Sequence, residues 1–286
     1  MSEKSDSVRR WRNPSFVESA GAEKVSGSLL MGSALRDRVL SGWALGTFII
    51  DLPDPATLTA VSLAGFDFAV LDMEHSSVDF TKLEALIKAG HAAGLAMLVR
   101  PWGEDIGLIG KVLDMGAHGI MAPHVDTPER ARAVVSQARF APRGNRGFSP
   151  LTKYDSLKEP LHSLDESTYV VIQIEGRAAI DRVEDIAKVP GIDAIFVGPY
   201  DLALSLGVPP GSKEVIDAAG RIAAAVPDNL GLGIYIDDPT TCGDWTNSGF
   251  ALQCVSFDGR MLADGARSVV KRARSSVSGR EGKQKP

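Results

Sequence analysis

The chain has 286 residues, 44% of them hydrophobic and 23% charged, and its 31 basic and 36 acidic side chains give a formal net charge of −5. This composition is ordinary for a soluble globular protein and predicts no nucleic-acid partner, because non-specific nucleic-acid binding depends on basic side chains that neutralise phosphates. No apolar run approaches the roughly 18 residues of a membrane-spanning helix, so no membrane partner is expected. The polar start of the chain and its two cysteines, Cys242 and Cys254, predict a cytoplasmic protein with reduced thiols.

Eight short apolar runs recur along the chain, each followed by a polar turn and a helix-periodic stretch. They cover residues 44–50, 68–71, 96–99, 118–122, 169–174, 194–197, 232–236 and 252–256. Runs that are apolar on both faces are typical of parallel strands covered on both sides. The alternation with helices predicts an α/β fold, a (β/α)8 TIM barrel with peripheral N- and C-terminal helices. A doubly wound open sheet is the alternative, but the Gly-rich phosphate turn usual after its first strand does not follow residue 50.

Capping residues mark the starts of several helices. Asp54, Asp79 and Thr127 each stand just before a helix-periodic stretch, where such side chains accept hydrogen bonds from the first free N–H groups. Proline, favoured at the first helical position, directly follows Asp54 and Thr127. A further helix is expected over 104–115, ending at Gly116.

The organisation expected from these elements is a single catalytic barrel over residues 31–275. Residues 1–30 are predicted to form a tail or peripheral helix, and residues 276–286 a disordered basic tail. The Gly/Pro/Ser-rich stretch 141–168 is predicted to be an irregular connection after the fourth strand. We expect this connection and neighbouring subunits to choose the substrate.

The chemistry of such a barrel lies where its strands end, so the first polar residues after each strand are the candidates. In chain order these are Asp51, Asp72, Glu74, His75, Arg100, His124, Glu175, Asp201, Asp237 and Asp258. Each by itself can be a helix cap. Residues 13–265 hold 20 basic and 33 acidic side chains, and Arg100 is the one base expected among these strand-end acids. So acidic a mouth should repel an anionic ligand unless a cation is bound.

Glu175 and Asp201 follow adjacent predicted strands and should face the same mouth. Two carboxylates without a neighbouring lysine repel each other, and a hard divalent cation relieves that repulsion. Mg²⁺ suits such an oxygen-rich site best, and Mn²⁺ or Co²⁺ can also serve it. Asp201 can instead cap the following helix. No lysine follows a strand, so carbanion stabilisation by a Schiff base is not expected and a metal would have to supply it.

Two further strand-end residues are candidates for catalysis. The Arg100 guanidinium suits a carboxylate or a developing enolate oxygen, and its alternative role is a salt bridge to local acids. His75 is a candidate general base, because an imidazole exchanges protons near neutral pH, and a structural role is its alternative.

Several motifs resemble one enzyme family. The run GFDFAVLDMEH at 65–75 is similar to the AGFDxxxxDxEH signature of the metal-dependent pyruvate aldolases, the HpcH/HpaI (4-hydroxy-2-oxoheptanedioate) aldolase family. In the family's order and spacing follow LVRP at 98–101, LDMGA at 113–117, PRGNRG at 142–147, QIE at 173–175 and VGPYDL at 197–202. The likeness extends from about residue 42 to 265.

The resemblance implies a carbon–carbon lyase that cleaves or forms 4-hydroxy-2-oxo acids through a metal-bound pyruvate enolate, with the divalent metal on Glu175 and Asp201. It also implies a homo-oligomer, a hexamer built from dimers that exchange their last helix. The substrate carboxylate would lie on backbone amides around Tyr200 and Asp201, at a helix start that follows Gly198 and Pro199, since helix N-termini suit anions.

Other roles follow from the same resemblance. Arg100 would stabilise the enolate oxygen, and His75, paired with Asp72, would be the acid/base acting on the aldol hydroxyl. Gln173 would lie near the metal. Asp114 would come from a neighbouring subunit to complete the pocket.

Two residues depart from the family pattern. Met73 stands where glycine is common, and His124 stands where the aldolases usually carry an apolar residue. A second imidazole at the mouth is similar to macrophomate synthase, a decarboxylating relative. The alternative is therefore an oxaloacetate-decarboxylating, carbon–carbon bond-forming synthase with His124 on the acceptor, although a loop histidine bonded to a backbone group is also open. A non-catalytic barrel that serves as a binding protein is the third reading, and metal content separates it from an enzyme.

Overall fold

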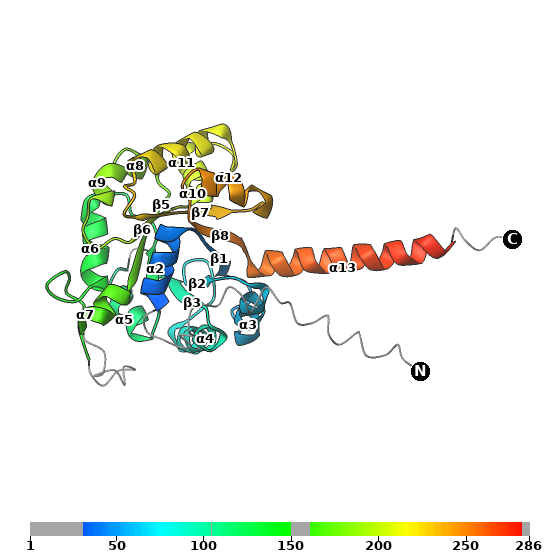
Figure 1. The fold of residues 1–286 in the computed structure, drawn as a ribbon, viewed down its shortest axis with the longest axis horizontal. Coiled ribbons are helices and arrows are strands. Elements are labelled where there is room, and N and C mark those ends of the chain that lie inside the picture. Colours follow the sequence, from blue (N-terminus) through cyan, green and yellow to red (C-terminus); the bar gives the residue numbers. More distant parts are fainter. Residues whose placement is uncertain (1–30, 104, 150–160, 282–286) are drawn as a thin grey trace.

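The computed structural model describes residues 31–103, 105–149 and 161–281, with side chains described to residue 277 (Figure 1). In this part of the chain, eight parallel strands close into a barrel in sequence order, which confirms the predicted TIM barrel. The strands are β1 (Ala44–Ile49), β2 (Phe68–Asp72), β3 (Ala96–Arg100), β4 (Gly119–Ala122), β5 (Tyr169–Ile174), β6 (Ala194–Val197), β7 (Gly231–Ile236) and β8 (Leu252–Phe257). The helices are α2 (Met31–Ser41), α3 (Pro55–Ala64), α4 (Phe80–Ala93), α5 (Leu108–Asp114), α6 (Pro128–Ala138), α7 (Leu161–Ser167), α8 (Arg177–Ile180), α9 (Val183–Ala187), α10 (Pro199–Leu206), α11 (Lys213–Ala225), the 3-10 helix η2 (Pro239–Thr241), α12 (Cys242–Asn247) and α13 (Asp258–Glu281).

The predicted helix starts are confirmed in α3, α4 and α6. The side chains of Asp54, Asp79 and Thr127 each accept a hydrogen bond from a backbone N–H in the first turn of the helix that follows. α4 ends at Gly94, whose left-handed φ of 82° suits a residue without a Cβ atom. α5 begins at Leu108, later than the expected residue 104, which lies outside the described residues.

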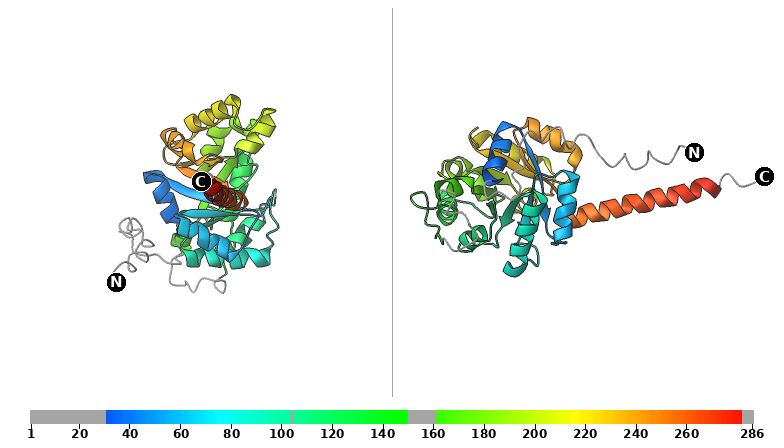
Figure 2. Two further views of the ribbon diagram at one scale, coloured as in Figure 1. Left: turned by 90° about the vertical axis from the view of Figure 1, so that its right-hand side faces the viewer. Right: turned by 60° about the horizontal axis from the view of Figure 1, so that its bottom comes forward.

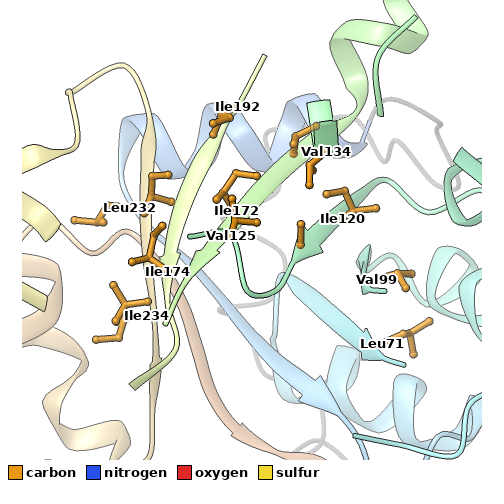
Figure 3. Close-up of a cluster of buried hydrophobic side chains, with 14 of the residues drawn as sticks. Leu71, Val99, Ile120, Val125, Val134, Ile172, Ile174, Ile192, Leu232 and Ile234 are labelled. Carbon is orange, nitrogen blue, oxygen red and sulfur yellow. The ribbon is translucent and has the colours of Figure 1, made fainter. Parts of the chain in front are cut away.

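The strands carry two apolar layers, because successive side chains point to opposite faces. Outward-facing residues such as Leu71, Val99 and Ile172 pack against the surrounding helices (Figure 3). Inward-facing residues fill the barrel together with Leu35 and Val39 of α2. The same alternation turns a second set of side chains inward where their strands end, which brings strand-end residues from different strands to one mouth. These are Asp72, Arg100, Gln173 and Glu175.

α2 packs beneath the barrel, against its inner core. A Cβ atom on Gly32 would lie 1.9 Å from the Ser167 carbonyl oxygen and 2.5 Å from that of His118, so only glycine permits this approach. Because His118 and Ser167 precede β4 and β5, α2 covers the amino ends of the strands and leaves the carboxyl ends open.

The stretch 141–168 differs from the predicted irregular connection. It contains α7, and it joins the end of α6 to the start of β5, at the amino ends of the strands. Asp165 of α7 accepts a hydrogen bond from the Phe140 backbone N–H at 2.7 Å and pairs with Arg143, which holds the connection there. The described residues of this segment lie at the amino ends of the strands of their own chain. The expectation that they choose the substrate bound by that chain is therefore wrong. Residues 150–160 lie outside the described part.

α13 is a 24-residue helix that projects away from the barrel (Figures 1 and 2). It continues to Glu281, so the tail expected from residue 276 begins inside this helix, and residues 282–286 are not described. Residues 1–30, expected to form a tail or peripheral helix, also lie outside the described part. Within the described ranges, no helix is long and apolar enough to cross a membrane.

Asp258, one of the strand-end acids, has a structural role. Its buried carboxylate accepts hydrogen bonds from the backbone N–H groups of Ile50, Asp51, Leu52 and Gly259, at 2.7 to 3.1 Å, and thereby ties β8 to the loop after β1.

We expect Asp258→Ala to lower the free energy of unfolding by about 2 to 4 kcal/mol, because four backbone N–H groups would lose a charged acceptor that is itself buried. Urea denaturation followed by circular dichroism measures this loss. Asp238→Ala is the matched control, since Asp238 is exposed and its carboxylate binds only within the turn to Thr240. Equal losses in the two variants would contradict the structural role of Asp258.

Candidate active site

A cavity of about 500 Å³ opens at the carboxyl ends of the strands. It is lined by Phe48, Ile50, His75, Arg100, Gln173, Phe196, Gly198, Pro199, Tyr200, Asp201, Tyr235 and Phe257. Seven of the eleven site residues predicted from the sequence are among them. Of the other four, Asp72 and Glu175 contact the lining residues Arg100 and Gln173. His124 contacts Glu175, whereas Asp114 lies elsewhere.

Arg100 is held by a pair of carboxylates. Its Nε and Nη2 atoms donate to the two oxygens of Asp72 at 2.9 and 2.7 Å, and its Nε lies 3.4 Å from Oε2 of Glu74. Burial opposes the charge of Arg100, but the hydrogen bond to Asp72 and the negative charges of Asp72, Glu74 and Glu175 outweigh it, so the pKa of the guanidinium is raised. A buried, permanently charged guanidinium with fixed orientation can stabilise an anionic oxygen in the cavity.

Glu175 lies just beyond the end of β5, almost fully buried. Its Oε1 accepts from the backbone N–H of His124 at 2.7 Å, and its Oε2 accepts from Nε2 of Gln173 at 2.5 Å. Burial raises the pKa of Glu175 to about 7; the hydrogen bond and charge of His124 oppose this shift, whereas the negative charges of Asp201 and Glu74 add to it. The negative charges of Asp201 and Glu74 therefore oppose the charged form of Glu175, which agrees with the repulsion expected between Glu175 and Asp201.

His124 bridges two of these acids. Its Nδ1 lies 3.0 Å from Oε1 of Glu175, and its Nε2 lies 3.0 Å from Oε1 of Glu74. The backbone of His124 is left-handed, with a φ of 54°, an uncommon conformation for a residue with a Cβ atom. This turn points both the backbone N–H and the imidazole at Glu175. Both ring nitrogens thus contact carboxylates, and His124 does not line the cavity.

The residues around Glu175 fit a divalent cation. Asp201, the second carboxylate, lines the same cavity, and the buried Oε1 of Gln173 has no hydrogen-bond partner among the described residues. A Cβ atom on Gly198 would lie 2.7 Å from Oε2 of Glu175, so glycine keeps this space open. No cluster of three or more His, Cys, Asp or Glu residues suited to a metal exists in the described ranges. Two carboxylates with an amide oxygen are nonetheless a set that Mg²⁺ accepts, because this ion keeps several waters.

The structure places Asp72 and Asp114 outside the lining of the cavity. The carboxylate of Asp72 contacts His75 only through the His75 backbone N–H, at 3.3 Å, whereas the His75 imidazole lies at the mouth with its Nε2 3.9 Å from Oε2 of Glu74. Asp114 lies at the end of α5, at the amino ends of the strands, where its Oδ1 accepts from Nη2 of Arg146 at 2.9 Å. Asp114 therefore does not contact the cavity of its own chain.

The opposite wall of the mouth carries a second polar group. The Asp237 carboxylate accepts hydrogen bonds from the hydroxyls of Tyr200 and Tyr235, the latter at 3.2 Å, and pairs with the Arg260 guanidinium. The expectation that Arg100 is the only base at the strand ends is therefore wrong, because Arg260 neutralises Asp237. Burial, followed by the hydrogen bond and charge of Asp237, raises the pKa of Tyr200, so its hydroxyl stays protonated and can donate.

Sequence reasoning named Glu74 as a strand-end acid but assigned it no role of its own, although it contacts Arg100, His75 and His124. It also missed four aromatic residues of the cavity, Phe48, Phe196, Tyr235 and Phe257. The alternation of the strands would have placed the first three inward, in the way it placed Gln173. Phe257 had no such signal, because β8 is irregular where this residue follows Ser256.

Comparisons with known proteins agree with this geometry. The model of the HpcH/HpaI aldolase/citrate lyase family matches residues 47–264. A pyruvate aldolase of Rhizobium etli is 34% identical over 232 residues, which cover 77% of this chain and 89% of that protein.

Solved structures show the same likeness. An aldolase/citrate lyase family protein of Burkholderia cenocepacia J2315 superposes with a TM-score of 0.79 and 29% identity, covering 84% of this chain and 99% of the other. Macrophomate synthase, at 22% identity, shares the fold with a TM-score of 0.77 over 94% of this chain and 99% of its own. The chain thus belongs to the HpcH/HpaI aldolase/citrate lyase family and is a carbon–carbon lyase.

Proposed function

We propose that the protein is a metal-dependent aldolase that cleaves 4-hydroxy-2-oxo acids to pyruvate and an aldehyde, and catalyses the reverse addition. The observation that carries this proposal is the convergence of Glu175, Gln173 and Asp201 beside Arg100 at one mouth of the barrel. The pyruvate aldolase of Rhizobium etli is similar in sequence over most of its length, which supports pyruvate as the common product.

The metal would be held by Glu175 and Asp201, with the unpaired Oε1 of Gln173 beside them. A divalent cation bound there would polarise the keto oxygen of the substrate and stabilise negative charge on it. Mg²⁺ is the cation we favour, because all the donors are oxygens; Mn²⁺ and Co²⁺ also bind such sites.

The substrate carboxylate would be bound by backbone groups of the chain itself. The first backbone N–H groups of α10, around Tyr200 and Asp201, suit the substrate carboxylate, because helix N-termini attract anions. Gly198 precedes Pro199 there, and its missing side chain leaves room beside Glu175.

Arg100 would stabilise the negative charge that forms in the reaction, and His75 would accept the proton that is released. The guanidinium of Arg100, fixed by Asp72 and Glu74, would stabilise the enolate oxygen. The imidazole of His75 is more than half exposed at the mouth, where it would take the proton of the C4 hydroxyl. Asp72 would act as a positioning residue, since it fixes Arg100 and the His75 backbone.

A product assay tests the proposal. The purified full-length protein with added Mg²⁺ is expected to release pyruvate from 4-hydroxy-2-oxo acids, and EDTA should abolish that release until Mg²⁺, Mn²⁺ or Co²⁺ is restored. Full activity after EDTA treatment, in protein shown by elemental analysis to be metal-free, would contradict the proposal. Absence of both divalent metal binding and cleavage would instead favour a non-catalytic barrel.

The decarboxylating synthase remains an alternative that no contact in the structure favours. It required His124 to bind the acceptor, but the imidazole of His124 contacts Glu74 and Glu175 instead. Decarboxylation of oxaloacetate would nonetheless be an expected side activity, because it forms the same pyruvate enolate.

We also propose that the protein is a homo-oligomer, as the family resemblance implies, with a hexamer as the expected form. Support comes from α13, which projects from the barrel and exposes apolar side chains: Leu262 is 61%, Val269 57% and Val277 62% exposed. These residues recur at spacings of seven and eight along the helix, so they lie on one face. A neighbouring subunit could then supply Asp114 to the cavity. A cytoplasmic location stays a prediction, based on the two cysteines, which are both free in the structure.

A further inference from the structure

We infer that the part of the cavity that holds the aldehyde portion of the substrate, the acceptor half, binds an aromatic group. The preferred substrates are then 4-aryl-4-hydroxy-2-oxobutanoic acids, and the released aldehyde is an aryl aldehyde. This inference rests on the proposed aldolase function and specifies its substrate class. It is carried by a continuous wall of aromatic side chains that lines the cavity.

The chain contains ten phenylalanines and four tyrosines, and five of these rings line the cavity at the mouth. Four of the five form a contiguous series. The ring centroid of Phe48 lies 6.3 Å from that of Phe196 and 6.0 Å from that of Tyr235, and the centroids of Tyr235 and Tyr200 are 5.8 Å apart. All three pairs fall within the range in which aromatic rings attract one another edge-on or tilted.

The aromatic series leads from the reacting groups to the rim. Phe48 lies beneath Arg100, whose guanidinium carbon is 4.9 Å from the ring centroid. Phe196 is fully buried at the bottom of the cavity, whereas Tyr200 is 46% exposed at the rim. A substrate whose oxo acid end lies at Arg100 would therefore extend its other end along this wall.

The fifth ring, Phe257, is turned toward the cavity by a bulge. Gly46 pairs with Cys254 in the ladder between β1 and β8, but Phe48 pairs with Phe257, so β8 contains one extra residue. Ser256 takes a left-handed φ of 58° at this place, and its carbonyl oxygen accepts from Oγ1 of Thr47 at 3.1 Å. Bulges next to active sites characteristically redirect a side chain, and here the redirected side chain is Phe257.

The charges at the mouth oppose an acceptor that carries an anion. Arg260 is paired with Asp237, and Asp237 also accepts from both tyrosine hydroxyls. Arg100 is paired with Asp72 and serves the oxo acid end. Among the described residues on the acceptor side, no unpaired cation is left for a second carboxylate, a phosphate or a sulfonate. A neutral, flat, apolar group is the ligand that this wall complements.

The reaction would proceed as an ordinary retro-aldol cleavage. The C3–C4 bond breaks while the C4 hydroxyl proton passes to His75, and the aldehyde carbonyl forms at C4. The electron pair of the broken bond remains on the three-carbon fragment as the pyruvate enolate, which then takes up a proton at C3. Aldehyde and pyruvate together contain all the atoms of the substrate.

The experiment compares three substrates cleaved by the full-length protein with Mg²⁺. The substrates are 4-hydroxy-2-oxo-4-phenylbutanoate, 4-hydroxy-2-oxopentanoate and 4-hydroxy-2-oxopentanedioate, which present a phenyl, a methyl and a carboxylate group to the acceptor side. We expect kcat/KM for the phenyl substrate to exceed the other two by about 20-fold, since its ring buries more apolar surface.

Variants of Tyr235 separate the ring from its hydroxyl. Tyr235→Leu should lower the ratio of phenyl to methyl kcat/KM by about 5-fold, whereas Tyr235→Phe should keep it within about 2-fold. Phe66→Leu is the matched control, because Phe66 precedes β2 at the opposite end of the barrel, and it should leave the ratio unchanged. A ratio that falls equally in Tyr235→Leu and Phe66→Leu would overturn the inference.

Failure of this inference can be told apart from failure of the proposed function by proton exchange at C3 of pyruvate in D2O, which needs no acceptor. If pyruvate exchanges its protons but the phenyl substrate is cleaved no better than the other two, only the aromatic inference is wrong. If the protein neither exchanges these protons nor cleaves any of the three substrates, the aldolase proposal fails and the inference fails with it.

Discussion

Replacement of Glu175 by glutamine is expected to lower both pyruvate proton exchange and retro-aldol cleavage by about a thousand-fold, equivalent to about 4 kcal/mol of barrier. Glutamine keeps the shape of the side chain but removes the negative charge that a divalent cation would bind. Its amide oxygen can still accept from the His124 backbone N–H, and its amide nitrogen can donate to Oε1 of Gln173 once the Gln173 amide rotates, so the fold should persist. Isothermal titration with Mn²⁺ is the direct measurement, and it should show the loss of binding independently of any activity.

Asp238→Asn is the matched control for this loss of metal binding. Asp238 follows β7 at the same end of the barrel, but it is exposed and does not line the cavity. It should bind Mn²⁺ as the parent protein does. Retained Mn²⁺ affinity in Glu175→Gln would reject Glu175 as a ligand. Equal losses of Mn²⁺ affinity in both variants would show that the summed negative charge of the mouth, rather than one site, attracts the metal.

The second large effect is expected at His75. His75→Ala should slow retro-aldol cleavage by about 10² to 10⁴-fold, because the proton of the C4 hydroxyl would lose its acceptor. Decarboxylation of oxaloacetate has no such proton to remove, so its rate should stay within about tenfold of the parent value. Steady-state kinetics of the two reactions on the same preparation give this comparison.

His162→Ala provides the control, because His162 is an exposed residue of α7 at the other end of the barrel. Neither reaction should change in that variant. A parallel loss of cleavage and decarboxylation in His75→Ala would show that His75 supports the fold or the oxo acid end of the site instead of transferring the hydroxyl proton.

Local patterns in the chain were sufficient to define the elements of the barrel. The buried run at 169–174 is β5 with the same bounds, and the strand-end positions of Arg100 and Glu175 followed from the ends of such runs. The caps at Asp54, Asp79 and Thr127 were also predictable. These features depend on residues a few positions apart, whose hydrogen bonds and apolar periodicity hold in any fold that contains the element.

Contacts between strand ends could not be predicted from such local patterns. His124 was read as a residue for the acceptor, but the closed barrel brings it against Glu175, 51 residues away, and against Glu74. Asp258 and Asp237 were predicted as strand-end acids without a stated partner, but one binds the loop after β1 and the other pairs with Arg260.

The chain sequence by itself therefore determined the fold class, the family and the set of groups at the carboxyl ends of the strands. The tertiary structure alone decided which of those groups meet, and which aromatic rings face them. The physical reason is that barrel closure and ladder register set these distances, and a single extra residue at Ser256 turns Phe257 toward the cavity without leaving a periodic trace in the sequence.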